Sequence, residues 1–373
     1  MTQCTVETID SFARFEALKQ DWHDLVNASD ANCLFLTWEW LFTWWKHRAE
    51  DRRLQLVTLR SDGQLIAVLP LALQPWHRRR LRPYPALDFI GMGEVGSDYL
   101  DILIRRGREK YACEVLASYL AKRGHVLELS RVNGDSGQAV ALAAALQEHG
   151  WSALGTATDV CPIIPLSGLS WDTYLATLGA EHRYNFRRRL KNLEKHAQLT
   201  LERVQTEEQR RVCLRLLVKL HRLCWQERGG SGAMHTETLV RFHEEFSRLA
   251  LARGWLRLYI LRLNGEAAAA WYGFHYNGVF YFYQSGYEPR FAKQSVGLVM
   301  TGLAIKNAIE EGAQIYDFLL GDERYKFLWT HEQRELVRLG AYPPSVRGAL
   351  YRQFIELQWS VKKRIWNYLP SAG

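Results

Sequence analysis

A cluster of charged side chains follows a hydrophobic segment in the last third of the chain. Residues 314–320, QIYDFLL, are predicted to form a buried strand. Directly after it come Gly321, Asp322, Glu323, Arg324, Tyr325 and Lys326. Ligands usually bind at the carboxyl ends of strands in α/β folds, so four charges and a phenol at this place indicate a functional site. The alternative is a polar loop that contains a turn glycine.

A second candidate binding element lies where an aromatic-rich strand, residues 279–287, leads into a helix. Its residues are Gln294, Ser295, Val296, Gly297, Leu298 and Val299. A helix N-terminus offers unpaired backbone N–H groups and the positive end of the helix dipole. Gly297 lets phosphates come close, and Ser295 is expected to cap the helix. The segment is therefore predicted to hold a pyrophosphate, and the alternative is a capped helix whose glycine serves packing.

Other motifs point away from several enzyme classes. Residues 91–96, GMGEVG, match the dinucleotide fingerprint GxGxxG, but the next residues alternate like a strand where that fingerprint needs a helix. We interpret them as a glycine-rich turn. The sequence contains no P-loop, HExxH or GxSxG motif. His221 and Cys224 share one helix face without a second pair nearby, so we expect no metal cofactor.

The elements that must position these residues follow one order twice. In the first half, a helix over 11–27 precedes a strand at 54–60, an Asp62-Gly63 hairpin turn and a returning strand. Pro70 predicts that the returning strand is interrupted or lies at an edge. Strands are then expected at 86–90 and 98–104, a helix at 108–123 closed by Gly124, and a strand at 125–132. Asp98 and Asp101 are interpreted as surface acids on one strand face.

The second half repeats this pattern. A strand at 256–262 leads through Asn264-Gly265 into a returning strand, and a strand at 279–287 follows. A helix over 296–311, closed by Gly312, precedes the strand at 314–320. This order predicts an α/β (α+β) fold with two modules, each a mixed, mainly antiparallel sheet flanked by helices. The predicted domains are 1–155 and 156–373, with a helical, basic insertion near 171–253.

Two helices carry basic charge. Residues 182–196 place six Lys or Arg on one helix, with Phe186, Leu190 and Leu193 on its other side. This face is either a phosphate or nucleic-acid surface or a solvated helix face, and the sequence favours neither. Residues 349–369 are amphipathic and basic, so they either lie on a membrane surface or dock onto their own domain. We favour docking.

The segment Gln294-x-x-Gly297-x-Val299 resembles the Q/R-x-x-G-x-G/A motif with which GNAT acyltransferases bind the pyrophosphate of acyl-CoA. Val299 departs from the Gly or Ala of that motif. The text YQSGYEPRFAKQSVGLV with IYDFLLGDERYKFLWT, and also TWEWLFTWW and SDYLDILI, resembles the CelD-like branch of cellulose and exopolysaccharide biosynthesis. The resemblance is strongest over 280–330. The tandem order is also similar to Fem-type aminoacyl transferases, which use two GNAT-like modules.

The GNAT resemblance implies that two neighbouring parallel strands, 279–285 and 314–320, splay apart around the acyl-thioester. An amine then attacks the thioester carbonyl directly, with no covalent enzyme intermediate. This reaction needs a base and an acid. The base candidates are Asp317, Asp322 and Glu323, and the acid candidates are Tyr325 and Tyr283. Lys326, Arg324, Tyr287 and Trp38 are expected to bind substrate, although core packing is the alternative for Trp38.

Composition agrees with an ordinary globular protein. The chain has 373 residues, 47% hydrophobic and 24% charged, and its length favours two domains. A net charge of +8 favours anionic partners. Six cysteines without framework spacing are interpreted as reduced thiols, and the sequence shows no signal peptide or membrane span. We therefore expect a cytoplasmic protein, with peripheral membrane contact through residues 349–369 as the alternative.

The function predicted from these patterns is transfer of an acyl group from acyl-CoA, acetyl-CoA included, to an amine or hydroxyl of a sugar, a polysaccharide precursor or a related small molecule. The N-terminal module is expected to be degenerate because no Q-x-x-G segment opens its helix. One alternative is a Fem-like transferase that uses aminoacyl-tRNA, and an acyl carrier is a further donor. Another is a non-catalytic accessory protein of exopolysaccharide synthesis. DNA is not an expected partner.

Overall fold

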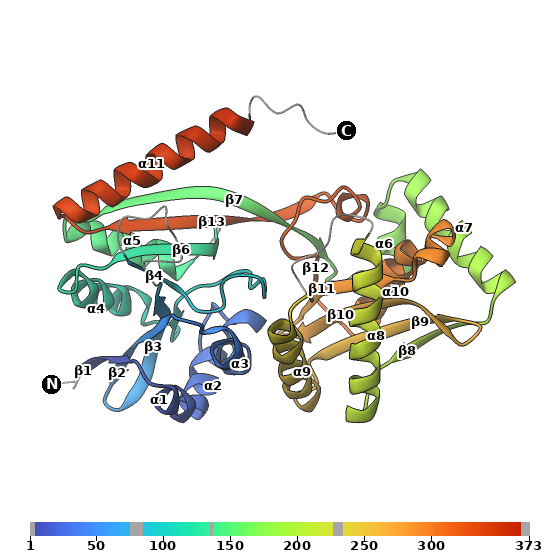
Figure 1. Cartoon of the computed structure of the whole chain (residues 1–373), viewed down its shortest axis with the longest axis horizontal. Coiled ribbons are helices and arrows are strands. Elements are labelled where there is room, and N and C mark those ends of the chain that lie inside the picture. The colour runs from blue at the N-terminus through green and yellow to red at the C-terminus, as the bar shows by residue number, and fades with distance from the viewer. Residues whose placement is uncertain (1–3, 75–84, 135–136, 227–233, 367–373) are drawn as a thin grey trace.

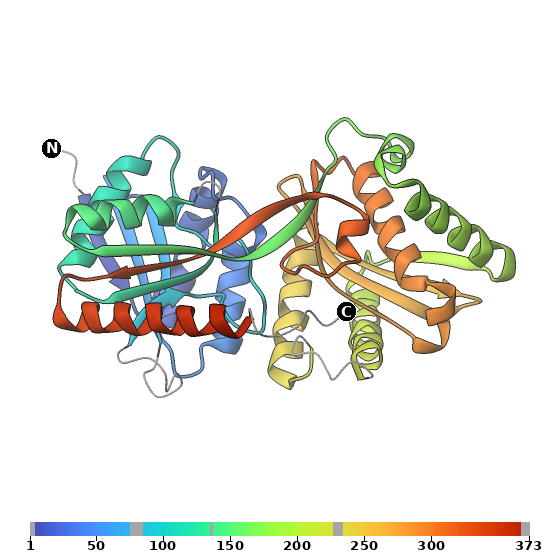
Figure 2. The same ribbon diagram turned by 90° about the horizontal axis from the view of Figure 1, so that it is seen from above.

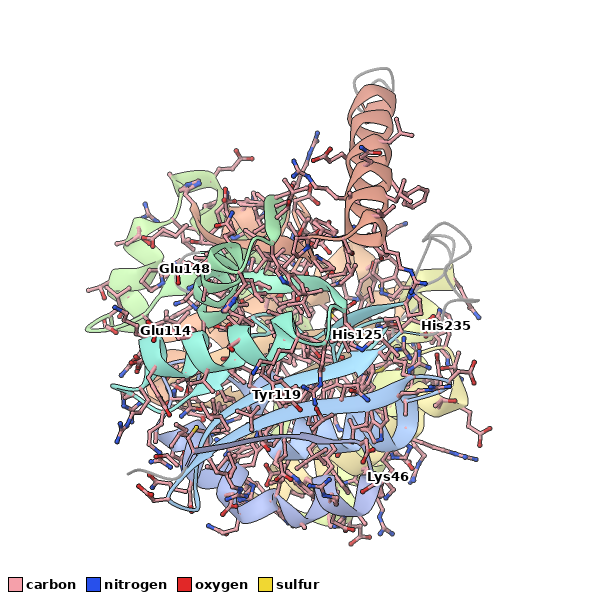
Figure 3. All side chains as sticks on the ribbon, turned by 90° about the vertical axis from the view of Figure 1, so that its left-hand side faces the viewer. Lys46, Glu114, Tyr119, His125, Glu148 and His235 are labelled. Atoms are coloured by element: carbon pink, nitrogen blue, oxygen red, sulfur yellow. The ribbon has the colours of Figure 1, made fainter. Side chains whose placement is uncertain are left out.

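The computed structural model describes residues 4–74, 85–134, 137–226 and 234–366, with the backbone alone over 358–366. Two α/β modules lie side by side (Figure 1). The first is built from strands β1 (Cys4–Ile9), β2 (Arg53–Ser61), β3 (Gln64–Leu73), β4 (Ala86–Phe89), β5 (Leu103–Ile104) and β6 (Val126–Asn133). Its helices are α1 (Phe12–Ala17), α2 (Lys19–Asn27), α3 (Trp38–Arg48), α4 (Glu109–Ala121) and α5 (Gln138–Glu148). Figure 3 labels Tyr119 on this module. The Tyr119 hydroxyl oxygen lies 2.7 Å from the hydroxyl oxygen of Thr8 in β1.

The second module follows along the chain. Its strands are β8 (Leu199–Arg203), β9 (Leu256–Leu263), β10 (Glu266–Tyr276), β11 (Val279–Tyr287) and β12 (Ile315–Asp317). Its helices are α6 (Trp171–Thr177), α7 (Ala180–His196), α8 (Glu207–Gln226), α9 (Glu237–Ala252) and α10 (Val296–Glu310). The short 3₁₀ helix η3 (Pro289–Gln294) precedes α10. The long strands β7 (Ser152–Pro165) and β13 (Glu332–Tyr342) connect the modules, and α11 (Val346–Trp366) ends the described chain.

One mixed sheet runs through both modules. Its order is β1-β2-β3-β4-β6-β13-β7-β12-β11-β10-β9-β8, and β5 pairs with β3 outside this path. The pairs β4–β6 and β11–β12 are parallel, and the other pairs in the described chain are antiparallel. The predicted fold class, two modules with mixed, mainly antiparallel strands and flanking helices, is confirmed.

A two-stranded ribbon joins the modules. β7 and β13 pair antiparallel from Ser152–Tyr342 to Ile163–Glu332, and β13 continues the pairing onto β6 of the first module. At its other end β7 pairs with β12 of the second module. The two strands cross from one module to the other in both views (Figures 1 and 2). The domain boundary predicted at 155/156 therefore falls inside a strand that serves both modules.

The helix α11 packs on the first module. Its buried Tyr351 and Ile355 contact Ala86, Val126 and Tyr342 of that module's sheet. The expected docking of the C-terminal helix is thus observed, but on the module that lies far from it in the sequence. No helix in the described part of the chain is both long and apolar enough to span a bilayer.

The Trp-rich segment lies between the modules. Trp40 and Trp44 of α3 are buried. The Trp40 ring meets Phe242 and Phe246 of α9 at centroid distances of 5.1 and 4.6 Å. One hydrophobic core therefore extends from the first module into the second, and a separate core lies under α10 on the other face of the second sheet. Residues 38–45 of α3 are all buried between the two modules, which explains why most of them are apolar.

The repeated hairpin turns form as predicted. Asp62-Gly63 has φ values of 48° and 80°, and Asn264-Gly265 has 50° and 83°, which are the positive values that this turn needs. Pro70, however, lies in an uninterrupted internal strand between β2 and β4. Its carbonyl accepts a bond from the Ile90 amide at 2.9 Å. The prediction of an edge or a break at Pro70 was wrong.

Residues 98–104 are not a continuous strand. Only Leu103–Ile104 pairs as β5, and Tyr99 has a φ of 57°, which extended backbone does not adopt. The Asp98 and Asp101 side chains are 2% and 4% exposed. Asp101 accepts the Gln138 and Ala139 amides at the start of α5, at 2.8 and 2.7 Å. The interpretation of both acids as surface residues was wrong, because each holds a loop by polar bonds inside the protein.

Other departures are local. The helix predicted over 11–27 is divided at Leu18 into α1 and α2. β8 lies within the stretch predicted to be helical, where it forms the outer strand of the sheet next to β9. The strand predicted at 314–320 pairs only over Ile315–Asp317. Beyond it Leu319 takes a φ of 56°, so the chain turns away from the sheet before the charged loop.

Candidate active site

A cavity of about 340 Å³ opens where the two modules meet. β11 and β12 pair in parallel only from Val279–Ile315 to Tyr281–Asp317, and β11 then continues to Tyr287 while β12 ends. The cavity lies beside this divergence. It is lined by residues of the glycine-rich turn, of β11 and of the loop after β12, including Val95, Asp98, Arg131, Trp225, Tyr283, Gln284, Ser285, Leu320, Glu323, Tyr325 and Lys326. Four of the residues predicted from sequence, Tyr283, Glu323, Tyr325 and Lys326, are among them.

Asp98 is the buried carboxylate of this cavity. Its Oδ1 accepts from Arg131 Nη1 at 2.7 Å, and its Oδ2 accepts from the Leu320 backbone amide at 3.0 Å. Burial raises the pKa of Asp98, and the positive charge of Arg131 opposes that shift. A buried carboxylate with a raised pKa is suited to accept a proton. Its two partners come from different modules, so the site is complete only when both are in place.

Asp317 lies at the end of β12 and is fully buried. Its Oδ2 accepts from the Tyr99 hydroxyl at 2.8 Å, and its Oδ1 accepts from the Leu319 amide at 2.8 Å. Burial raises the pKa of Asp317 to about 6, while the two hydrogen bonds lower it. Asp317 does not line the cavity. Its contacts join the loop after β12 to the loop that carries Asp98, which is a positioning role.

The loop 321–326 is ordered around Lys326. The Lys326 ammonium lies 2.8 Å from the Glu323 carboxylate and donates to the Leu320 and Leu319 carbonyls at 2.8 and 3.3 Å. Lys326 is 4% exposed. Gly321 has a φ of 134°, and a Cβ there would overlap the Glu323 carboxylate and the Lys326 ammonium. Glu323 is thereby held at the cavity, whereas Asp322 and Arg324 are exposed and do not line it.

Tyr283 sits at an irregularity of β11. The pairing with β10 shifts from Tyr272–Gln284 to Gly273–Phe282, so Tyr283 has no partner across the strand and forms a β-bulge. Its hydroxyl donates to the Val95 carbonyl in the glycine-rich turn. Burial raises the pKa of Tyr283 well above its ordinary value. The phenol therefore keeps its proton at neutral pH and can serve as a hydrogen-bond donor.

The predicted pyrophosphate segment lies at the start of α10. Ser295 occupies the N-cap position of α10 as predicted, but it has a φ of 59° and its side chain makes no capping hydrogen bond. A Cβ built on Gly297 would meet only Tyr287 Cδ1, at 3.7 Å, and otherwise open space. Val296 and Val299 are buried in the second core, and Leu298 is half-buried beside them. Val299 therefore faces the core, and Gly297 lies on the open side of this helix end.

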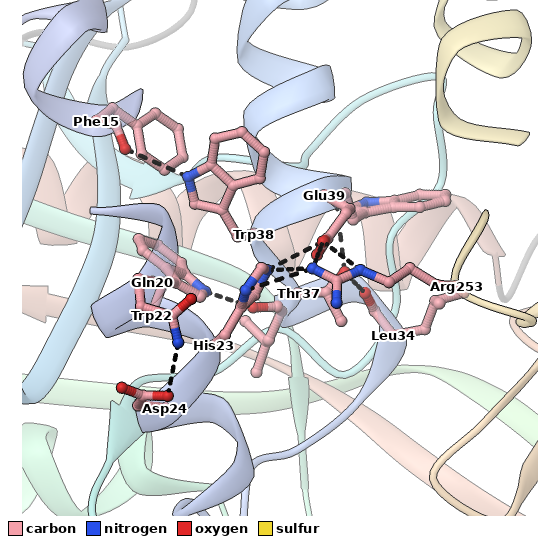
Figure 4. A network of polar contacts seen from close by, with 12 residues as sticks. Phe15, Gln20, Trp22, His23, Asp24, Leu34, Thr37, Trp38, Glu39 and Arg253 are labelled. Carbon is pink, nitrogen blue, oxygen red and sulfur yellow. Dashed lines mark hydrogen bonds and ion pairs between the residues drawn. The ribbon is translucent and has the colours of Figure 1, made fainter. Parts of the chain in front are cut away.

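The remaining predicted residues lie elsewhere. Gln294 lines a separate cavity next to α7. Trp38 is buried, stacks on Phe42 at 4.1 Å between ring centroids and borders a further cavity near Glu39. There Arg253 and His23 both contact the Glu39 carboxylate, at 2.6 and 2.9 Å (Figure 4).

His221 is buried and its Nδ1 lies 2.9 Å from the Ser285 carbonyl. Within the described residues, no group of three or more His, Cys, Asp or Glu side chains is arranged to hold a metal.

Asp98 and Arg131 are the site residues that the sequence interpretation missed. Both belong to the first module, which was expected to be degenerate. The available signal was the glycine-rich turn directly before Asp98, because Val95 and Gly96 of that turn also line the cavity. A carboxylate on a loop and an arginine in a strand carry no spacing signal that would bring them together.

Part of the chain matches a known protein family. Residues 180–327 match the family described as acetyltransferase (GNAT) domain. This chain has a GNAT-type fold. The GNAT match spans α7 to the charged loop and so includes the start of α10 and the strand pair β11–β12. A search of curated proteins found no match.

Solved structures resemble the fold of most of this chain. FemX aligns with a TM-score of 0.63 at 14% identity, covering 90% of this chain and 98% of FemX. A conserved protein of unknown function from Bacteroides thetaiotaomicron aligns with a TM-score of 0.55 at 14% identity, covering 90% and 99% of the two chains. L-PGS from Bacillus licheniformis aligns with a TM-score of 0.52 at 12% identity, covering 92% and 96%. At these identities the likeness concerns the fold.

Proposed function

We propose that this chain is an acyltransferase that moves an acyl group from acyl-CoA directly to an amine or hydroxyl of an acceptor. The observation that carries the proposal is the cavity at the divergence of β11 and β12. Tyr283 and Ser285 of β11 line it, and Tyr287 of the same strand lies beside Gly297 at the open start of α10. One strand thus links the helix end that is predicted to bind the pyrophosphate to a cavity that holds a buried carboxylate.

The proposed chemistry uses residues of this cavity. The acceptor nitrogen or oxygen forms a bond to the thioester carbonyl carbon, and the bond from that carbon to sulfur breaks. Asp98 or Glu323 takes the proton of the acceptor, and the Tyr283 or Tyr325 hydroxyl protonates the leaving thiolate. Asp317 and Asp322 are less suitable bases than was expected, because neither lines the cavity.

The proposed acceptor is a sugar, a polysaccharide precursor or a related small molecule. This class is supported by the CelD-like sequence resemblance. Arg131, whose guanidinium borders the cavity beside Asp98, is suited to bind a carboxylate or phosphate on such an acceptor. The test is release of free CoA from acetyl-CoA in the presence of amino sugars and sugar nucleotides, with product mass measured. We expect turnover with at least one acceptor and its loss in Gly297→Trp.

A second candidate donor is aminoacyl-tRNA. The tandem fold shared with FemX and the six Lys and Arg of α7 favour it. In that reaction the broken bond is the ester of the tRNA 3′ end, and the cavity residues keep their roles. Transfer of a radiolabelled amino acid from tRNA, with no use of acetyl-CoA, would replace the first candidate. If the protein binds neither acyl-CoA nor aminoacyl-tRNA, that result would favour a non-catalytic accessory role in exopolysaccharide synthesis.

A further inference from the structure

The outer face of α7 carries positive charge that the protein itself does not neutralise. Its six cations are Arg183, Arg187, Arg188, Arg189, Lys191 and Lys195. Across the described residues, none of these six forms an ion pair with a carboxylate, although ion pairs are frequent elsewhere in this chain. Two acids, Glu181 and Glu194, also lie on α7, so its six cations leave a net positive charge. A net positive helix surface whose cations are not paired with carboxylates attracts an anionic ligand.

The orientation of α7 is fixed by its apolar side. Phe186 and Leu193 are buried in the core beneath α10. The Phe186 ring lies so close to Gly302 of α10 that a Cβ at Gly302 would overlap it, and it meets Trp329 at 5.7 Å between centroids. Because these contacts hold α7 against α10, the basic face is held beside the start of α10.

A groove of about 490 Å³ lies between α7, η3 and the β9–β10 turn. Arg189, His196 and Lys293 supply its basic groups, and Asn192 and Gln294 supply amides. Glu266 is the acid among the groove's lining residues, and Arg290 pairs with it at 2.6 Å. Arg189 donates one bond to the Lys293 carbonyl at 3.2 Å, which leaves further N–H donors of its guanidinium for a ligand.

We propose that this groove, the α7 groove, binds a phosphate of the acyl donor that lies outside the predicted pyrophosphate position. Gln294 lines the groove and is followed along the chain by Ser295 and the start of α10, so the two positions adjoin. The phosphate is either the 3′-phosphate of CoA or a backbone phosphate of an RNA-linked donor. The inference rests on the proposed function, because it assumes that the donor lies across the start of α10.

The test compares CoA with dephospho-CoA, which lacks only the 3′-phosphate, and with a short RNA hairpin that ends in CCA. Affinities are measured by calorimetry at two salt concentrations for the wild type and for Arg189→Gln/Lys293→Gln. Lys110→Gln is the control, since Lys110 is an exposed cation on α4 of the first module and does not line the groove. A charge-assisted phosphate contact predicts about tenfold tighter binding of CoA than of dephospho-CoA. We expect the double variant to lose that preference and the control to keep it.

The RNA arm identifies the source of the phosphate. If RNA is the ligand, its affinity falls steeply with salt and falls further in the double variant, while CoA and dephospho-CoA bind alike. Unchanged affinities for CoA and RNA in the double variant would overturn the α7 groove proposal alone, because donor binding would persist. No binding of CoA or RNA to the wild type would overturn the proposed function together with it.

Discussion

At the residue scale, the junction of the modules contains carboxylates with different surroundings. Asp98 borders the cavity and shares its charge with Arg131, whereas Asp317 is enclosed and accepts from Tyr99 and from a backbone amide. Glu323 is more exposed and pairs with Lys326. The position of each acid, and not its residue type, decides whether it can meet an acceptor.

Replacement of Asp98 tests the assignment of the base. Asp98→Asn keeps the size and the acceptor oxygen but removes the charge, so we expect turnover to fall about 10²- to 10⁴-fold with little change in CoA affinity. Asp322→Asn is the control, because Asp322 is exposed and outside the cavity. Equal activity of both variants would assign the proton transfer to Glu323 or to solvent.

The raised pKa of Asp317 predicts a dependence of stability on pH. The folded pKa of about 6 lies above that of an exposed Asp, near 3.9, so the folded protein binds more protons between these values. The contribution of Asp317 to stability is complete below pH 4 and is lost as pH rises through 6. We expect Asp317→Asn to remove a loss of about 2 kcal/mol between pH 4 and 7. Urea unfolding of both proteins across that range measures it, and identical pH profiles would contradict the prediction.

At the element scale, the start of α10 separates a core-facing side from an open side. Val299 lies on the core side. The valine, where the GNAT motif has Gly or Ala, therefore packs in the core and does not fill the space near Gly297. We expect Val299→Ala to lower the free energy of unfolding by about 2 kcal/mol and to leave CoA affinity unchanged. Thermal unfolding with and without CoA measures both quantities. A marked gain in CoA affinity would show that Val299 does restrict the site.

The sequence was most informative where the signal is local. Asp62-Gly63 and Asn264-Gly265 predict their hairpins because the turn type needs those residues, and Gly312 ends α10 for the same kind of reason. The charged loop after β12 was also found from local order. Asp98 was not found, because the residues around it alternate between polar and apolar as in a surface strand. Its partners, an arginine and a distant backbone amide, leave no signal in the local sequence. Pairing of β13 with β6 has no local signal at all.

At the scale of the whole molecule, the first module depends on the end of the chain. β13 pairs with β6, and Tyr342, Tyr351 and Ile355 cover the first module's sheet. A chain that stops at residue 331 would expose the edges of β6 and β7, which invite aggregation. We therefore expect that truncation to be insoluble or to lose the cooperative unfolding transition. Co-expression of residues 332–373 in trans is the control, and a soluble, cooperatively folded 1–331 would contradict the prediction.

The ribbon of β7 and β13 also bears on how the protein is made. During synthesis the strands of the second module, β8 to β12, are available before β13 leaves the ribosome, so the later module can close while the earlier one still lacks a strand. N-terminal domains usually fold first. Here the sheet of the first module is complete only after β13 has been synthesised, about 200 residues downstream of β6. Strand pairing over such a long sequence separation is slow. Until β13 is synthesised, the edge of β6 is unpaired. We therefore expect chaperones to bind the nascent chain at this edge.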